Sequence, residues 1–123
     1  MIRRFVKSYE ASAAIGSCLI VAFSDAAASS KVAIASAANQ PLAGTTGQVG
    51  ASAAGAMVDV EKGGIPQVRC GAVVKAGDPL TSDANGKAIK ATAAGQRLIG
   101  YAEAPGVLDD IIDYAFAPGV LAV

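Results

Sequence analysis

The chain of 123 residues contains no histidine and no tryptophan, and it has only two cysteines, Cys18 and Cys70. Without histidine, a serine-hydrolase triad, an imidazole general base and any histidine-containing metal site are excluded. Two thiols are too few for an all-cysteine zinc site, which takes four. The two cysteines could form one disulfide, but both stand beside apolar residues, which favours buried free thiols.

Net charge is also absent, because ten lysine and arginine residues balance ten acidic residues, and charged residues make up only 16% of the chain. A neutral chain is not expected to bind nucleic acid or an anionic membrane through bulk charge. No apolar run reaches the length of about 20 residues that a membrane-spanning helix requires. We therefore expect neither a nucleic-acid partner nor a membrane partner.

Large apolar side chains are scarce, since much of the 53% hydrophobic content is alanine and only 5% of the chain is aromatic. The larger apolar residues lean towards valine and isoleucine, which favour strands. Fourteen glycines and five prolines separate short apolar runs. The sequence therefore predicts a mainly β fold, a small antiparallel barrel or sandwich, whose thin core takes part of its stability from a partner surface.

Strands are expected over the following short runs: 18–23, 31–35, 57–61, 65–70, 87–90, 97–102 and 111–116. Lys62, Gly63 and Gly64 separate two of these runs, which predicts a hairpin with an exposed turn. The sequence at 104–108 recurs at 117–121, and we interpret both copies as turns or strand exits of similar geometry.

Two segments depart from this pattern. Residues 1–10 hold three of the ten basic groups and one acid, which predicts an extended basic N-terminal arm ahead of a single β-rich domain over 11–123. The tract 36–56 is rich in alanine, serine and glycine. It has too few large apolar groups to fold alone, so we expect a long loop or a segment held by a neighbour.

A secretory signal is the alternative interpretation of the N-terminus. Arg3, Arg4 and Lys7 precede an apolar run over 15–23, and Asp25-Ala26-Ala27-Ala28 follows like a signal-peptidase site. Glu10 and the small polar residues inside the run weaken the pattern. A secreted or periplasmic β-domain, cleaved near residue 28, nevertheless stays open on the sequence alone.

No cluster of reactive side chains predicts an enzyme. Asp109, Asp110 and Asp113 are interpreted as a solvated turn and strand entry, because no further ligand stands at a useful spacing. Asp83-Ala84-Asn85-Gly86 is typical of a turn whose side chains bond to its own backbone. Ser-x-x-Lys and P-loop motifs are missing. We therefore expect no catalytic residues, no cofactor and no metal.

Several stretches of the chain match a known family. They are 7–11, 58–60, 64–65, Gly71, Val73, the Gly-Asp-Pro-Leu-Thr-Ser-Asp block at 77–83, 86–88, 99–103 and 117–121. With these pieces the chain resembles the capsid cement, or head decoration, proteins of tailed phages, over most of its length. The tract 36–56 is the departure, since it matches poorly.

The resemblance implies a non-enzymatic, β-rich protein that oligomerises on the exterior of the virion capsid and clamps subunits of the major capsid protein. Many weak contacts repeated over a symmetric shell sum to strong binding. Arg3, Arg4 and Phe5 of the arm, and Lys62, Gly63 and Gly64 of the turn, would then be capsid or inter-subunit contacts. The partners implied are the major capsid protein and other copies of the chain, a homotrimer rather than a dimer.

Overall fold

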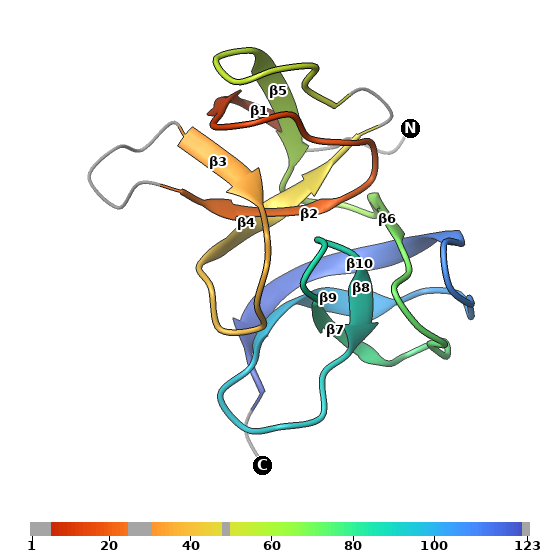
Figure 1. Ribbon diagram of the computed structural model, residues 1–123. Helices are drawn as coiled ribbons and strands as arrows, with labels where there is room; N and C mark the ends of the chain where they lie inside the picture. The colour runs from red at the N-terminus through yellow and green to blue at the C-terminus, as the bar shows by residue number, and fades with distance from the viewer. Residues whose placement is uncertain (1–5, 25–30, 48–49, 122–123) are drawn as a thin grey trace.

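The computed structural model describes residues 6–24, 31–47 and 50–121 (Figure 1). These residues form ten β-strands with turns and loops between them, and they contain no helix. The strands are β1 (Val6–Ala11), β2 (Ile20–Phe23), β3 (Lys31–Ile34), β4 (Leu42–Thr46), β5 (Met57–Glu61), β6 (Gln67–Arg69), β7 (Pro79–Ser82), β8 (Ala88–Lys90), β9 (Arg97–Ala102) and β10 (Ile111–Val120). The predicted mainly β fold with a small barrel is confirmed.

The first five strands close into a barrel in the order β1-β3-β2-β4-β5, here called the first barrel. The last five form a second sheet in the order β6-β10-β9-β7-β8. A single parallel bridge between Cys70 and Ala88 links the two edges of the second sheet. The bridge covers part of each edge, so neither edge strand is free along its whole length to pair with a strand of another chain.

The two halves repeat one arrangement. Strands β1 to β5 correspond to β6 to β10, and the parallel contact of β1 with β3 corresponds to the Cys70–Ala88 bridge. Matching pairs in the two halves have the same register: Tyr9–Val58 and Val68–Ile112, Val21–Gly44 and Leu80–Gly100, Thr45–Glu61 and Tyr101–Ala115. The chain is thus two copies of one five-stranded unit in tandem.

Gly44 and Gly100 stand at equivalent places and show why this unit needs glycine there. Their φ angles are +153° and +155°, which side chains rarely adopt. A Cβ at either position would overlap a carbonyl oxygen of the neighbouring strand, that of Glu61 or that of Ala115. Glycine lets the two backbones approach closely enough to pair.

A recurring turn joins strands at the same end of the units. Residues 12–20, 71–79 and 103–111 share one conformation, here called the turn module. Its seventh residue has a positive φ: 56° at Cys18, 88° at Gly77 and 69° at Asp109. The module at 71–79 and the module at 103–111 bond to each other through Val74 and Gly106. This pairing holds two loops side by side although they are distant in sequence.

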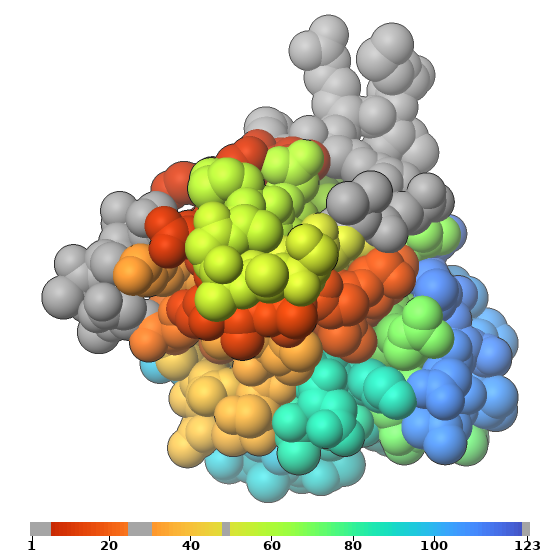
Figure 2. All heavy atoms as spheres, turned by 45° about the horizontal axis from the view of Figure 1, so that its top comes forward, coloured from red at the N-terminus to blue at the C-terminus, as the bar shows by residue number. Residues whose placement is uncertain are grey.

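The two halves meet along a buried contact, here called the seam. At the molecular surface, Figure 2 shows orange and yellow segments of the first half next to teal segments of the second. Tyr114 is fully buried, and its hydroxyl lies 2.9 Å from the hydroxyl of Thr45 on β4. Backbone N–H groups of Ile20, Arg69 and Arg97 donate across the seam to the carbonyls of Gly86, Cys18 and Ala38. Burial raises the pKa of Tyr114, which keeps the phenol neutral.

Three expectations need correction. Residues 6–10 of the predicted arm form most of β1, because Tyr9 is buried and the strand pairs with β5 from Val6 onward. Residues 1–5 lie outside the described residues. Of the two alternatives for the tract 36–56, the loop is wrong over Leu42–Thr46, where β4 is a barrel strand held by its pairing with β2 and β5.

The hairpin predicted around Lys62 is also wrong, because β5 pairs with β1 and β4 while β6 pairs with β10. Residues 62–66 instead lead from the first barrel to the second sheet. Of the two alternatives for the repeated sequence at 117–121, the strand exit is the one found, since residues 117–120 are the last residues of β10. Its first copy, at 104–108, lies inside a turn module as expected.

Substitution of Gly77 by alanine should destabilise the fold by about 1–2 kcal/mol, because a Cβ is strained at this φ even though it would meet open space. The matched control is Gly119→Ala, where a Cβ also meets open space and the φ angle is not positive. Urea denaturation should show a change within about 0.5 kcal/mol for the control. Equal effects of the two substitutions would contradict this account of the turn.

Tyr114→Phe should lower the free energy of unfolding by about 1–2 kcal/mol, because the Thr45 hydroxyl loses its partner inside the seam. Thr45→Val removes the other partner. In the double variant both groups are apolar, so its cost should fall below the sum of the single costs. Strict additivity in chemical denaturation would mean that the two hydroxyls do not interact.

Candidate functional site

Of the two sets of contact residues predicted from the sequence, the structure describes only the set at Lys62, Gly63 and Gly64. Arg3, Arg4 and Phe5 are outside the described residues, so their role stays a prediction. Lys62 is half-buried against the first barrel. Its Nζ donates a hydrogen bond to the Tyr9 hydroxyl at 2.8 Å and lies 5.3 Å from the centroid of that ring and 5.5 Å from that of Phe23. Lys62 is therefore engaged within its own chain.

Gly63 and Gly64 belong to the connection between the two halves. Gly63 is buried, whereas Gly64 is exposed and has a φ of +73°. The carbonyl of Gly64 accepts a hydrogen bond from the backbone N–H of Phe116. The connection therefore already lies beside β10 before β6 begins. The structure thus brings these residues onto the side of β10, away from any hairpin tip.

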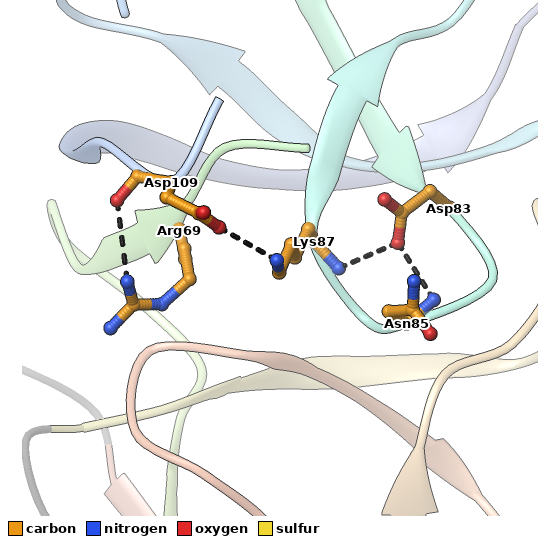
Figure 3. Close-up of polar contacts among 5 residues, drawn as sticks. All are labelled: Arg69, Asp83, Asn85, Lys87 and Asp109. Carbon is orange, nitrogen blue, oxygen red and sulfur yellow. Dashed lines mark hydrogen bonds and ion pairs between the residues drawn. The ribbon is translucent and has the colours of Figure 1, made fainter. Parts of the chain in front are cut away.

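A cluster of charged side chains lies where β6, the start of β8 and the last turn module meet (Figure 3). Lys87 Nζ lies 2.6 Å from Asp109 Oδ1, and an Arg69 guanidinium nitrogen donates to the Asp109 carbonyl at 3.3 Å. The hydrogen bond from Lys87 lowers the pKa of Asp109 below its ordinary value. This contact ties the last turn module to the neighbouring strand on the protein surface.

The remaining acids of the motifs close turns. Asp83 Oδ1 accepts the backbone N–H groups of Asn85 at 2.8 Å and Lys87 at 2.9 Å, as predicted for a turn bonded to its own backbone (Figure 3). Asp110 does the same for Val107, at 3.0 Å. Within residues 6–24, 31–47 and 50–121, no group of three or more acidic, cysteine or histidine side chains could hold a metal ion.

Both cysteines are buried and free, which confirms the prediction of buried thiols. Burial raises the pKa of Cys18 and of Cys70. Thiols of this kind are poor nucleophiles and poor metal ligands near neutral pH, because the thiolate is the reactive form.

One shallow hollow of about 270 Å³ lies at the edge of the seam, and its lining residues are Leu42, Arg97, Leu98, Pro118, Gly119 and Val120. Arg97 supplies the single charged group there. A lone guanidinium among apolar side chains offers no pair of groups for acid–base chemistry. Among the described residues no helix has the length and hydropathy needed to cross a membrane.

The feature that sequence reasoning missed is an apolar surface on the last two turn modules. It is formed by Val73, Val107, Leu108 and Ile111, which are 68%, 53%, 60% and 45% exposed, and is here called the sheet-end patch. In Figure 1 the loops that carry it, before β7 and before β10, lie together at one side of the second sheet. The sequence placed Ile111 in a predicted strand and Val107 and Leu108 in a predicted turn or strand exit, and nothing in it indicated that these residues and Val73 form one exposed group.

Comparison with known proteins gives one line of evidence. No protein-family model matches the chain, and no curated protein matches it in sequence. Among solved structures, the chain is similar to the head fiber gp8.5 N base in bacteriophage phi29, with a TM-score of 0.72 and 17% sequence identity. The match covers 98% of this chain and 100% of that chain.

The likeness extends over both halves, so it concerns the whole tandem arrangement. At 17% identity it establishes a shared fold, and the protein that shares the fold is part of a phage head. The resemblance to phage head decoration proteins seen in the sequence is confirmed at the level of the fold.

Replacement of Lys87 by methionine should raise the pKa of Asp109 towards the ordinary carboxyl value, measured by NMR titration of the side-chain carboxyl. The folded-state pKa lies below the unfolded one, so the contact stabilises the protein above the unfolded pKa. That contribution is lost as the pH falls through the folded pKa. The wild type should therefore lose more stability than Lys87→Met in this acidic window.

The matched control is Lys90→Met, because Lys90 Nζ lies 3.9 Å from an Asp78 oxygen and does not contact Asp109. An unchanged Asp109 titration in Lys87→Met would show that the 2.6 Å contact between Lys87 and Asp109 does not persist in solution.

Proposed function

We propose that the protein is a non-enzymatic structural component of a tailed-phage virion. In this role it binds the outer surface of the capsid and stabilises the lattice of the major capsid protein. The observation that carries the proposal is the end-to-end match to a phage head fiber base, which includes both halves of the chain. The resemblance of the 77–83 block and its companions to head decoration proteins supports the same conclusion independently.

The site chemistry supports a binding role rather than a catalytic one. Its charged groups are occupied in turns and in the Lys87–Asp109 contact, and its cysteines are buried. Four of the nine exposed large apolar side chains among the described residues lie on the last two turn modules. Apolar patches of this sort mark surfaces for protein partners.

The secreted alternative fits the structure poorly. Cleavage near residue 28 would remove β1 and β2, which are two of the five strands of the first barrel. It would also remove Tyr9 and Val21 from the core of that barrel, and Ile20 from the seam. The remaining chain would expose the edges of β3, β4 and β5, which makes a stable cleaved product unexpected.

Within the proposed role, copies of the chain associate with one another, a homotrimer being the form best matched to three-fold positions of a capsid. Arg3, Arg4 and Phe5 remain the proposed contacts of the arm. Lys62, Gly63 and Gly64 are weaker candidates, because Lys62 and Gly63 are already engaged in the first barrel.

The proposal is tested by adding the purified protein to phage heads that lack it. Cryo-electron microscopy should show added density at regular positions on the outside of the shell, of a size that fits the ten-stranded fold. Decorated heads should release DNA at a higher temperature than bare heads from the same preparation. Density on the inside, or none at saturating protein, would contradict the proposal.

A further inference from the structure

We propose that Asn85 is a deamidation site that the closed seam protects, so that a chain whose seam opens is changed irreversibly at this residue. Asn85 lies in the turn between β7 and β8, directly before Gly86. Its side chain is exposed, whereas Gly86 is buried. The chemistry of this pair goes beyond the proposed function and does not depend on binding to a capsid.

An asparagine that precedes a glycine loses its side-chain amide without an enzyme. The backbone nitrogen of the glycine gives its proton to hydroxide and attacks the side-chain carbonyl carbon of the asparagine. A bond forms between these two atoms, the bond from the carbon to the amide nitrogen breaks, and ammonia leaves with a proton from water. Water then opens the resulting cyclic succinimide to aspartate or to isoaspartate. Glycine favours the attack because it has no Cβ to shield its nitrogen.

Neither reacting group at this position is held by a hydrogen bond. The side-chain amide of Asn85 has no partner among the described residues, and the same holds for the backbone N–H of Gly86. The sequence has one other asparagine, Asn39, which is followed by Gln40 rather than by glycine. Asn85 is therefore the asparagine of this chain whose neighbour favours the reaction.

The conformation of the turn keeps the two groups apart. The backbone N–H of Asp83 donates to the carbonyl of Lys87 at 2.9 Å, and the φ of Gly86 is +75°. These features define a hairpin loop built on a type I turn that ends in a left-handed glycine. Asn85 is the third residue of that turn, where ψ is about 0°.

This ψ is unfavourable for ring closure. A ψ of about 0° brings the Gly86 nitrogen over the nitrogen of Asn85 itself, about 120° around the Cα–C bond from the Cβ that leads to the reacting carbon. Closure of the ring needs the Gly86 nitrogen and this Cβ to be nearly eclipsed. The peptide between Asn85 and Gly86 must therefore rotate before the reaction starts.

Hydrogen bonds within the turn oppose the rotation. Asp83 Oδ1 accepts the backbone N–H of Asn85 at 2.8 Å and that of Lys87 at 2.9 Å, as Figure 3 shows. The carboxylate thus holds the backbone on both sides of the peptide that has to turn. Bonds to a charged acceptor are stronger than those between neutral groups.

The seam opposes the rotation from the other side. The carbonyl of Gly86 accepts the backbone N–H of Ile20 at 2.7 Å across the seam. A Cβ at Gly86 would lie 2.7 Å from Ile34 Cγ2 and 2.9 Å from the carbonyl oxygen of Ile20, so the residue is closely enclosed by the first half. Gly86 cannot turn over while the two halves are in contact.

Opening of the seam therefore exposes the chain to the reaction. Once the halves separate, the rate follows the fraction of chains that are open, provided that opening and closing are fast. In the isoaspartate product the backbone runs through the former side chain and is longer by one methylene. The lengthened turn no longer presents the Gly86 carbonyl to Ile20, and the modified chain cannot close its seam as before.

A comparison of folded and unfolded protein tests the protection. The full chain is incubated at about pH 8 in buffer and in denaturing guanidinium chloride, and deamidation is followed by peptide mapping with mass spectrometry. Asn85 should react at least roughly tenfold more slowly in the folded chain, because the closed state holds the turn. Asn39 is the internal control and should stay largely intact in both samples. Equal rates at Asn85 in the two samples would overturn the proposal.

The role of the turn is tested by Asp83→Ala, which removes both hydrogen bonds to the carboxylate. Below its melting temperature this variant should deamidate at Asn85 at least roughly threefold faster than the wild type. Asp59→Ala is the matched control, because Asp59 accepts the Ser8 hydroxyl at 2.7 Å on the first barrel, away from this turn. It should react like the wild type. A wild-type rate in folded Asp83→Ala would contradict the protection by the turn.

The irreversible step is tested on chains that have been deamidated in guanidinium chloride and returned to buffer. The isoaspartate form, isolated by chromatography, should melt at a lower temperature than the wild type or fail to refold. Asn85→Asp is the matched control: it carries the same charge on a normal backbone and should melt like the wild type. An isoaspartate form with the melting temperature of Asn85→Asp would overturn the proposed loss of the seam, and it would leave the capsid experiment unaffected.

Discussion

The seam between the two halves is the constraint on which the structure depends. One hydrophobic cluster contains Ile20, Ala22 and Ala35 of the first barrel together with Val68, Leu80 and Tyr114 of the second sheet. The Tyr114–Thr45 hydrogen bond lies within this shared core, and three backbone hydrogen bonds cross it. Each half has few large apolar side chains of its own, so residues of both halves are needed to fill the shared core. The two halves are consequently packed around one shared core.

Much of the fold could be predicted from the sequence, but its symmetry could not. Period-two patterns and short valine-rich runs located most strands within a residue or two. The tandem repeat was hidden because equivalent core positions hold different residues, such as Tyr9 and Val68, or Val60 and Tyr114. The positive φ angles of Cys18 and Asp109 carry no glycine to mark the turn modules. The Gly63-Gly64 pair predicted a hairpin because local sequence does not tell a tight turn from a link between two units.

The candidate site was less predictable for a related reason. Nothing in the local sequence of Val73, Leu108 and Ile111 shows that they share one surface, because their common exposure follows from a turn conformation that pairs two distant modules. Asp83 and Asp110 were correctly predicted to act in turns, because an acid near a glycine or at a strand entry commonly bonds to its own backbone. The phage-head resemblance rested on scattered motifs, and the fold shared with the phi29 head fiber base supports it over the full length.

The two halves contribute non-equivalent surfaces to the seam, so each half has one seam surface that is not used. In principle a third unit could pack on either unused surface by the same contact. Two of the three backbone donors that such an addition would use are missing from the sequence. Ile20 and Arg97 each donate a backbone N–H across the seam, and their counterparts in the other half are Pro79 and Pro41, which have no N–H. Stacking of chains into an open-ended filament is therefore disfavoured at both ends. The contact that joins the two halves within one chain is thereby kept from joining one chain to the next.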